Sequence, residues 1–554
     1  MSSNNYNTIG YSPGKEANMK SKFYVIAILT ALFFVAINSA VHSTPVNDCK
    51  AVIVTEFGPV KGACLNSVDV CVWAGIPFAA PPVGELRFKP PVNPEPWKNI
   101  RYATSFSPPC CQRDSKADIG RPWKIGSLIG QEDCLYLNIW RPRSGADKLP
   151  VMVWIHGGSF LTGAGSLPRY QGYRLAAERN VLIVTINYRL GPMGFLAQRD
   201  LSAEDPYKSS GDYGILDQIK ALEWVKRNIA AFGGDPDNVT VFGESAGGQS
   251  VLSLLASPLA KGLFNRAIIE SASHLSLSME EGFNYGDKLA KDLGCEKGHE
   301  LECLRERSAD AIFNVVLWDE TESGNSPFRP HIDGWVLPEK PLDAFKSGNY
   351  NRVPVLAGSN RDELKPFKYL DRKSRRMKRE DAERRYGKKF GDEAARKIIE
   401  LYPFDSFDSP VDAYDAVMGD WRLGCVAYCA AQAMASTNNV IYIYRFDFDE
   451  HRYPKAGAFH GMEIPFIFDS FDTMPFKLLF KKENVKTAAP LAETMRKYWT
   501  NFAATGNPNS DGLPNWPAFT AQSKQFILLD SAITTDIFKP DGRCAFWYDY
   551  MGKD

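Results

Sequence analysis

The stretch Gly243-Glu244-Ser245-Ala246-Gly247 fits the pattern Gly-x-Ser-x-Gly and lies at the junction of two secondary-structure signals. Residues 239–242 before it have the β-branched and aromatic content of a short buried strand, and residues 250–255 after it favour a helix. A strand that turns sharply into a helix exposes Ser245 at the turn, where the helix N-terminus supplies free N–H groups. The flanking glycines remove Cβ clashes in such a strained backbone. The stretch therefore predicts a strand–turn–helix unit with a nucleophilic serine beside its own anion site.

A serine hydroxyl is almost wholly un-ionised near neutral pH, so Ser245 needs a base, a group that orients the base, and donors for an oxyanion. Residues 151–155 form an apolar, strand-like run, and residues 156–160, His-Gly-Gly-Ser-Phe, follow as a loop of small residues. Such a loop can aim backbone N–H groups at a bound carbonyl, and the amide of Ala246 lies next to the nucleophile. We therefore expect the oxyanion donors in this loop and at Ala246.

The base and its orienting acid are sought further along the chain. Among the seven histidines, His460 stands in a loop of small residues, 457–463, that leads into the apolar run 464–468. Hydrolases built on this motif follow the order Ser, Asp or Glu, His, so the acid lies between Ser245 and His460. There the strand-like run 353–358 leads into a polar loop with Asp362 and Glu363. Composition and spacing leave the choice between these two acids open.

Taken in order, these features resemble the type B carboxylesterases and cholinesterases, and the similarity extends over nearly the whole chain after its N-terminal segment. Residues 243–247 match the nucleophile elbow of this family. The other matching segments are residues 75–79, 81–84, 86–88, 132–138, 187–189, 211–214, 217–218, 232–236, 499–503 and 505–508. The resemblance implies the α/β-hydrolase fold, an α/β architecture with a large mixed central sheet flanked by helices. It also implies insertions around an active-site gorge.

The resemblance assigns the catalytic roles by position. Ser245 becomes the nucleophile, His460 the base and Glu363 the acid, because the family uses the second residue of the Asp-Glu pair. Asp362 then becomes structural. The resemblance thus implies a serine hydrolase that cleaves carboxylic esters through an acyl-enzyme intermediate and needs no cofactor or metal. Activity is expected to rise with pH as His460 loses its proton, around its reference pKa of about 6.5.

The same comparison of positions places the oxyanion hole and a supporting residue. The expected donors are the main-chain amides of Gly157, Gly158, Ser159 and Ala246. Ser159 stands where many relatives have a third glycine, so its side chain narrows the loop. Ser271 matches a position that supports the acid and the histidine.

Two alternatives concern what the chain acts on. Trp123 lies close to the choline-site tryptophan of cholinesterases but is displaced by about one residue, and residues 274–279 lack the tryptophan that shapes a small acyl pocket. We therefore expect a broad carboxylesterase rather than a cholinesterase-type hydrolase of choline esters. A second alternative is a weakly active or inactive adhesion or binding module of the same fold, and retention of the three catalytic residues argues against it.

Composition agrees with a globular enzyme. The 554 residues include 44% hydrophobic residues, and no linker or repeat divides them, so residues 44–554 are expected to form one catalytic domain. The chain has 65 basic and 65 acidic residues and a formal net charge of zero, which gives no indication of nucleic-acid binding. The expected partner is a small-molecule ester, and the oligomeric state stays open.

The N-terminal 43 residues predict export. An apolar run at residues 23–37 follows Lys15, Lys20 and Lys22 and precedes small residues at 39–43, which is typical of a signal peptide. The run is short for a membrane span, but the segment before it is long for a signal. We expect a secreted protein, with a retained single-pass signal anchor as the alternative that would bring the protein to a membrane.

The eleven cysteines suit an oxidising compartment. The resemblance implies three disulfides, Cys111–Cys134, Cys295–Cys303 and Cys425–Cys544. Five cysteines remain without an implied partner, and a bond between Cys64 and Cys71 across a hairpin is one possible pairing. These five are Cys49, Cys64, Cys71, Cys110 and Cys429. Asn238 begins the one glycosylation sequon, but it adjoins the strand before Ser245, which argues against its occupancy.

Overall fold

The computed structural model describes residues 48–115, 125–316, 327–365, 376–437 and 439–552. These residues belong to one compact unit, Asn47–Asp554. The N-terminal segment 1–43, with its predicted signal, and Trp123 lie outside the described residues. Among the described helices, none has the length and hydrophobicity that a membrane span requires.

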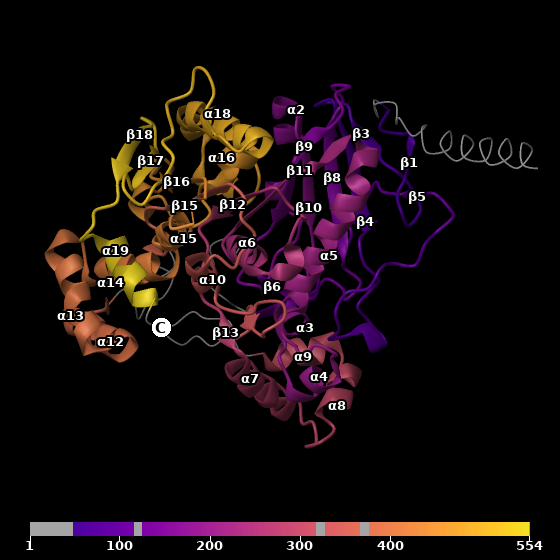
Figure 1. Ribbon diagram of the computed structural model, residues 1–554, viewed down its shortest axis with the longest axis horizontal. Helices are drawn as coiled ribbons and strands as arrows, with labels where there is room; N and C mark the ends of the chain where they lie inside the picture. Colours follow the sequence, from indigo (N-terminus) through magenta and orange to yellow (C-terminus); the bar gives the residue numbers. More distant parts are fainter. Residues whose placement is uncertain (1–47, 116–124, 317–326, 366–375, 438, 553–554) are drawn as a thin grey trace, which may run out of the picture. The chain divides into compact units, whose positions relative to one another are not determined.

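A large mixed sheet organises the compact unit (Figure 1). Within the described part of the chain it has 11 strands in the order β18-β17-β16-β15-β12-β11-β9-β10-β8-β4-β3. The pairs from β10 to β17 are parallel, and the pairs at both edges are antiparallel. The strands are β3 (Ala63–Leu65), β4 (Val70–Pro77), β8 (Tyr136–Pro142), β9 (Leu149–Ile155), β10 (Leu182–Ile186), β11 (Gly234–Glu244), β12 (Arg266–Glu270), β15 (Val355–Asn360), β16 (Ile441–Phe446), β17 (Gln525–Leu529) and β18 (Thr534–Ile537).

Helices cover both faces of this sheet. One face packs against α2 (Tyr173–Arg179), α16 (Ile464–Phe468) and α18 (Lys482–Thr505). The other packs against α5 (Tyr213–Asn228), α6 (Ala246–Ala256), α10 (Pro341–Ser347) and α15 (Val426–Ala435). Because both faces are covered, the central strands are continuous apolar runs rather than alternating ones. This is the mixed sheet flanked by helices that the sequence predicted.

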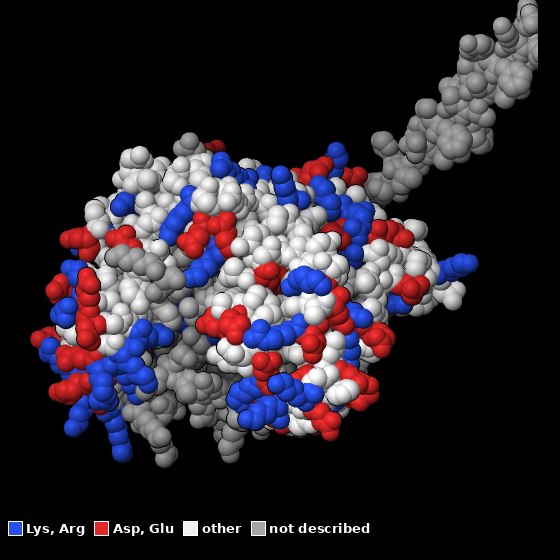
Figure 2. Space-filling model, turned by 60° about the horizontal axis from the view of Figure 1, so that its bottom comes forward, with Lys and Arg blue, Asp and Glu red and all other residues white. Residues whose placement is uncertain are grey.

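Shorter elements extend from this framework. Three small sheets are formed by β1 (Val52–Val54), β2 (Pro59–Lys61) and β5 (Arg101–Tyr102), by β6 (Gln112–Ser115) and β7 (Ile125–Ile129), and by β13 (Leu277–Ser278) and β14 (His331–Ile332). The remaining α-helices are α3 (Gly191–Phe195), α4 (Arg199–Glu204), α7 (Met279–Asp292), α8 (Glu300–Glu306), α9 (Ala309–Val315), α12 (Arg379–Phe390), α13 (Asp392–Leu401), α14 (Pro410–Gly419), α17 (Phe476–Leu479) and α19 (Arg543–Met551). On the face drawn in Figure 2, basic and acidic side chains are interspersed.

The predicted local elements lie at these positions. The strand expected at 151–155 is the greater part of β9, and the one expected at 239–242 lies in the C-terminal half of β11. The helix expected at 250–255 lies within α6, and the strand expected at 353–358 is β15, shifted by two residues. The carboxyl ends of these adjacent parallel strands meet at one edge of the sheet, where the predicted site residues begin.

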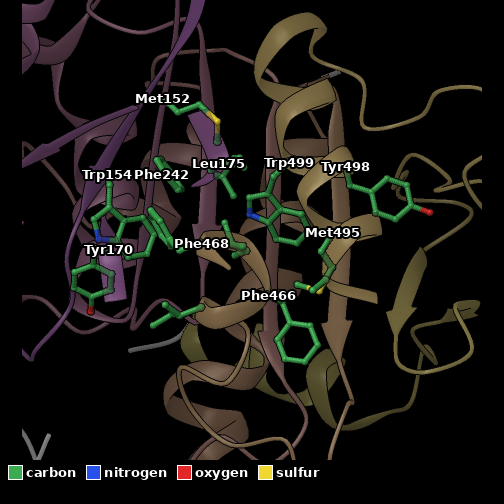
Figure 3. Close-up of a cluster of buried hydrophobic side chains, with 14 of the residues drawn as sticks. Met152, Trp154, Tyr170, Leu175, Phe242, Phe466, Phe468, Met495, Tyr498 and Trp499 are labelled. Atoms are coloured by element: carbon green, nitrogen blue, oxygen red, sulfur yellow. The ribbon is translucent and has the colours of Figure 1, made fainter. Parts of the chain in front are cut away.

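A buried aromatic cluster joins segments that flank the predicted site residues (Figure 3). The Trp154 ring centroid, on β9, lies 4.8 Å from that of Phe242 on β11 and 4.9 Å from that of Phe468 on α16. All three side chains are buried, and Trp154 packs edge-on against both phenylalanines. The cluster thus fixes the strand before residues 156–160, the strand before Ser245 and the helix after His460 against one another.

The disulfides differ in part from those expected. Cys134 bonds to Cys110, so the expected pair Cys111–Cys134 is wrong, and Cys111 is a buried thiol. Cys110 pairs with Gln131 in an isolated β-bridge, and its Cα lies 4.9 Å from that of Cys134, a separation that suits a disulfide. Burial raises the pKa of the Cys111 thiol to about 12, which keeps it protonated.

The other described cysteines form three further disulfides and leave two free thiols. Cys64 lies opposite Cys71 in the β3–β4 ladder, but Cys71 bonds to Cys49, so the possible Cys64–Cys71 bond does not form. Cys64 and Cys429 are free thiols. The two other bridges are Cys295–Cys303 and Cys425–Cys544.

Replacing Phe468 with alanine should destabilise the protein by about 3–5 kcal/mol, because it leaves a cavity beside Trp154. Urea unfolding measures this loss. Phe468→Leu, which fills more of the space, should cost clearly less. A loss below about 1 kcal/mol for Phe468→Ala would contradict the structural role of the cluster.

Candidate active site

Ser245 occupies the turn between β11 and α6. Its φ of 60° and ψ of −119° lie in a region that non-glycine residues rarely adopt, at a cost of about 1–3 kcal/mol. The strain is held by the sheet, since the Ser245 N–H donates to the Glu270 carbonyl at 2.9 Å. Residues 241–244 and 246–250 are buried, whereas Ser245 is only partly buried. The turn therefore presents this one residue outward.

The glycines of the motif are required by close approach of backbone to backbone. A Cβ on Gly247 would lie 2.0 Å from the Ile155 carbonyl oxygen, and one on Gly243 would lie 2.6 Å from the Gly247 carbonyl carbon. Both distances are far inside van der Waals contact. The elbow therefore depends on glycine at both positions.

The loop at residues 156–160 begins against this elbow. A Cβ on Gly157 would lie 3.0 Å from the Ser245 Cβ and 2.7 Å from the Glu244 carbonyl oxygen. Gly158 has a φ of 118°, and Ser159 has a φ of 57°, in the left-handed region that favours glycine. Ser159 thus adopts a conformation that favours glycine, at the position where the resemblance implies a glycine in related proteins. Ala246 starts α6 directly after Ser245.

His156 holds this loop in place and is neutral. Its ring stacks on Tyr188 with centroids 4.4 Å apart, and the Tyr188 hydroxyl donates to the His156 carbonyl oxygen at 2.8 Å. Burial lowers the pKa of His156 to about 4. The Tyr188 contact was not predicted from the sequence, which placed residues 187–189 only among the matching segments.

His460 and Glu363 contact each other directly. The His460 Nδ1 lies 2.6 Å from the Glu363 Oε2, and the His460 main-chain N–H donates to the Glu363 carbonyl oxygen at 3.2 Å. The other carboxylate oxygen of Glu363 accepts the main-chain N–H of Asn360 at 2.8 Å. Glu363 is buried, so these bonds fix its carboxylate against the imidazole.

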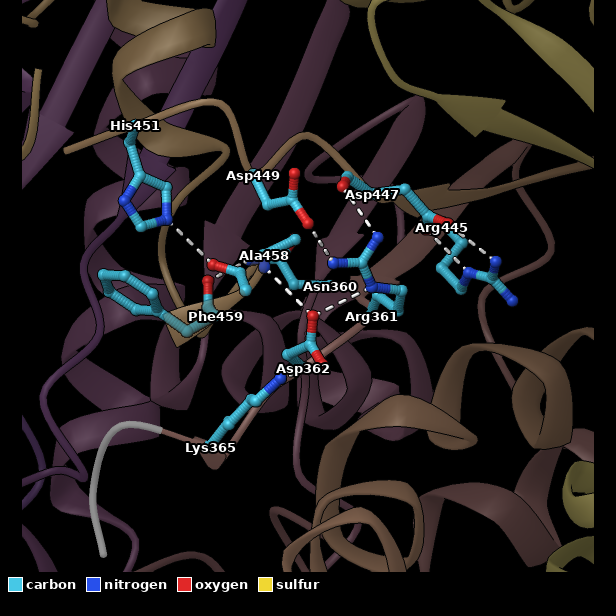
Figure 4. Close-up of polar contacts among 11 residues, drawn as sticks. Asn360, Arg361, Asp362, Lys365, Arg445, Asp447, Asp449, His451, Ala458 and Phe459 are labelled. Carbon is cyan, nitrogen blue, oxygen red and sulfur yellow. Dashed lines mark hydrogen bonds and ion pairs between the residues drawn. The ribbon is translucent and has the colours of Figure 1, made fainter. Parts of the chain in front are cut away.

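Asp362, the other acid of this loop, has a different role (Figure 4). Its main-chain N–H donates to the Ala458 carbonyl oxygen at 2.9 Å, and its Oδ2 accepts the Ala458 N–H at 3.1 Å. It also forms ion pairs with Arg361 at 2.8 Å and Lys365 at 3.6 Å. Asp362 therefore fastens the histidine loop to the acid loop, and of the two acids of this loop it is Glu363 that reaches the imidazole.

A second carboxylate contacts the other ring nitrogen, which the sequence did not predict. The His460 Nε2 lies 3.1 Å from the Glu244 Oε1. Burial lowers the pKa of His460, but the negative charges of Glu244, Glu363 and Glu463 raise it, and the net effect is a pKa of about 9. Burial in turn raises the pKa of Glu244. The sequence expectation of about 6.5 took no account of these carboxylates.

Ser271, the remaining position that the resemblance implied, directly follows β12, the strand beside β11. Ser271 is fully buried, has a φ of 47°, and donates its N–H to the Gly358 carbonyl oxygen at 2.9 Å. Its neighbour Glu270 accepts the Trp499 indole N–H at 2.7 Å. Among the described residues, no three His, Cys, Asp or Glu side chains are arranged to hold a metal ion.

Known proteins share this sequence and fold. The model of the Carboxylesterase family matches residues 49–547. The chain belongs to this family. A para-nitrobenzyl esterase of Bacillus subtilis is 39% identical over 490 residues, which cover 88% of this chain and 96% of that protein. A liver carboxylesterase of Sus scrofa is 35% identical over 550 residues, which cover 91% of this chain and 93% of that protein.

The solved structures agree with the sequence relatives. A carboxylesterase of Geobacillus stearothermophilus, solved at pH 6.2, superposes with a TM-score of 0.79 at 35% identity over 90% of this chain and 99% of that chain. The fold is therefore that of the α/β-hydrolases, and the chain is a carboxylic-ester hydrolase.

The pH dependence of kcat/KM tests the charge around His460. If His460 is the catalytic base that the resemblance implies, it acts when neutral, and kcat/KM should rise as pH passes the pKa of His460, with a midpoint above 6.5. Glu244→Gln removes a negative charge 3.1 Å from Nε2 and should move this midpoint to lower pH. Glu483→Gln, at an exposed position in the first turn of α18, serves as the control and should leave it unchanged. A wild-type midpoint at or below 6.5, unaffected by Glu244→Gln, would contradict the assignment.

Proposed function

We propose that Ser245, His460 and Glu363 form the catalytic triad of this esterase. The observation that carries the proposal is the 2.6 Å contact between the His460 Nδ1 and the Glu363 Oε2, together with the position of the His460 Nε2, which lies 3.1 Å from Glu244, the residue directly before Ser245. In the first half-reaction His460 takes the hydroxyl proton as the Ser245 Oγ attacks the ester carbonyl carbon. The imidazolium then protonates the leaving alcohol, and an acyl-enzyme remains. Water repeats these steps in the second half-reaction to release the acid.

The proposed oxyanion hole consists of main-chain amides at Gly157, Gly158, Ser159 and Ala246. Support comes from the contact of Gly157 with the elbow and from the position of Ala246 at the start of α6. Amides fixed in this way stabilise the negative charge of the tetrahedral intermediate without reorganising during the reaction. Each donor of this kind contributes about 3–4 kcal/mol to transition-state stabilisation.

The proposed substrates are carboxylic esters of varied structure. The relatives carry names as different as para-nitrobenzyl esterase, liver carboxylesterase, acylcarnitine hydrolase and pyrethroid hydrolase, which favours a broad carboxylesterase. A cholinesterase-type activity is the second candidate, although Trp123, on which it depends, lies outside the described residues. An inactive binding module is disfavoured because the Glu363–His460 contact is intact.

The purified protein should hydrolyse p-nitrophenyl acetate, butyrate and a long-chain ester, and Ser245→Ala should lower kcat by roughly 10⁴- to 10⁶-fold. Hydrolysis is followed by p-nitrophenol release, with butyrylthiocholine as a parallel substrate. Ser253→Ala, on the buried part of α6, is the matched control and should retain activity. Equal, slow turnover by wild type and Ser245→Ala would favour the binding module, and a strong preference for the choline ester would favour a cholinesterase.

We further propose that residues 1–43 direct export and that residues 44–554 are the secreted catalytic domain. The four disulfides among the described residues suit an oxidising compartment. Asn238 stays the predicted glycosylation site, but its Nδ2 donates to the Ala504 carbonyl oxygen at 3.2 Å.

Expression in a secretory cell tests the export proposal. Active protein should be found in the medium, with an N-terminus near residue 44 by intact mass and N-terminal sequencing. Protein that stays with the membrane fraction and retains residues 23–37 would instead support the signal anchor. Treatment with an N-glycosidase, followed by mass measurement, reports whether Asn238 carries a glycan.

A further inference from the structure

Asn360 joins the acid loop to the histidine loop (Figure 4). It is the last residue of β15, and its main-chain N–H donates to the Glu363 Oε1 at 2.8 Å. Its side-chain Nδ2 donates to the Phe459 carbonyl oxygen at 2.8 Å and to the Glu463 Oε2 at 2.5 Å. Asn360 is only 2% exposed, so water does not compete for these bonds. A single residue thus contacts the acid and both sides of the histidine loop.

We propose that Asn360 is a positioning residue of this esterase: its side chain fixes the His460 loop relative to Glu363 and stabilises the charge of Glu463 behind the imidazole. The proposal rests on the catalytic roles proposed above for Ser245, His460 and Glu363. Asn360 acts through His460 and touches no reacting atom.

The positioning follows from the partners of the amide group. Phe459 directly precedes His460, and Glu463 follows it three residues later, so both bonds from Nδ2 constrain the segment that carries the ring. Loss of the donor would leave two buried acceptors without this partner, and the loop would relax toward other donors. The ring would then shift relative to Glu363, which is held independently by the Asn360 main chain. Small displacements of a catalytic base lower kcat strongly.

The amide also influences the charge next to the ring. Burial raises the pKa of Glu463 to about 8, and the hydrogen bond from Asn360 opposes this rise by favouring the carboxylate. The negative charge of Glu463 in turn raises the pKa of His460. Without the amide, Glu463 would be protonated more fully, and the pKa of His460 would fall.

Neighbouring elements contribute the other titratable groups around these two residues. Of these groups, Glu363 accepts the Asn360 main-chain N–H, and within the described residues none of them hydrogen-bonds the Asn360 side-chain amide. These groups are Glu244 of β11, Glu270 of β12, Glu363 after β15, Tyr444 of β16, and Asp420 and Arg169, which act on Glu363 and Glu244 respectively. Loss of the Asn360 side-chain donor therefore alters the charge around His460 by way of Glu463.

The test compares Asn360→Leu with wild type in p-nitrophenyl butyrate hydrolysis. Leucine has a similar shape and keeps the main-chain bond to Glu363, but it lacks the amide donor. We expect kcat to fall by about 10- to 100-fold with KM within about twofold, and the acid limb of kcat/KM to move to lower pH. An unchanged acid limb and an unchanged kcat, with only a lower Tm, would overturn the proposal.

Asn351→Leu is the matched control. The Asn351 Nδ2 likewise donates to two carbonyl oxygens, those of Leu254 at 2.9 Å and Ser257 at 2.8 Å, at the other end of α6 from Ser245. This variant should lower the Tm without moving the acid limb or kcat. An equal change of the acid limb in Asn351→Leu would show a general effect of lost stability and would overturn the proposal.

Glu463→Gln tests the same link from the partner side and remains informative if Asn360→Leu does not fold. It removes the charge and should move the acid limb to lower pH, and Asn360→Leu should add little further movement in that background. An acid limb unmoved by Glu463→Gln would overturn the role of the charge. Absence of Ser245-dependent hydrolysis in wild type would instead refute the proposed function, and the two failures are thereby distinguished.

Discussion

The packing of Trp154 against Phe242 and Phe468 is the contact on which the site depends. Each ring lies within a few residues of a segment of the proposed site: the loop at 156–160, the turn at Ser245 or the loop before α16. Because protein interiors are close-packed, a shift of one ring is transmitted to the others. The strained turn at Ser245 persists only because this surrounding structure over-determines it.

Much of the site could be predicted from the sequence because its signals are local. The elbow needs glycines at Gly243 and Gly247 for close contact, and such a need is visible as a pattern. The choice between Asp362 and Glu363 was not accessible from composition, because it depends on which side chain turns toward His460. Likewise the contact of Glu244 with the second ring nitrogen depends on how the end of β11 and the loop that carries His460 lie in space, which no spacing along the chain encodes.

The same limit explains why the sequence did not predict the Cys110–Cys134 disulfide or the raised pKa of His460. A resemblance identifies the segment that holds a cysteine, but it does not distinguish the adjacent Cys110 and Cys111, of which only Cys110 bonds to Cys134. A reference pKa describes a solvated imidazole, whereas His460 is enclosed with Glu244 and Glu363, whose charges outweigh the effect of burial. Both the disulfide pairing and the pKa depend on how the side chains are arranged in the folded structure.

The paired bonds between Asp362 and Ala458 have a consequence for motion during turnover. The Asp362 N–H donates to the Ala458 carbonyl oxygen, and the Ala458 N–H donates to the Asp362 carboxylate. The backbone two positions before His460 is therefore fixed to the loop at the end of β15. A hinge-like swing of that backbone would break both bonds at once. In the proposed mechanism, transfer of the proton from Ser245 to the leaving alcohol would then rely on torsion of the imidazole about its own side-chain bonds, a fast rotameric movement, rather than on movement of the main chain.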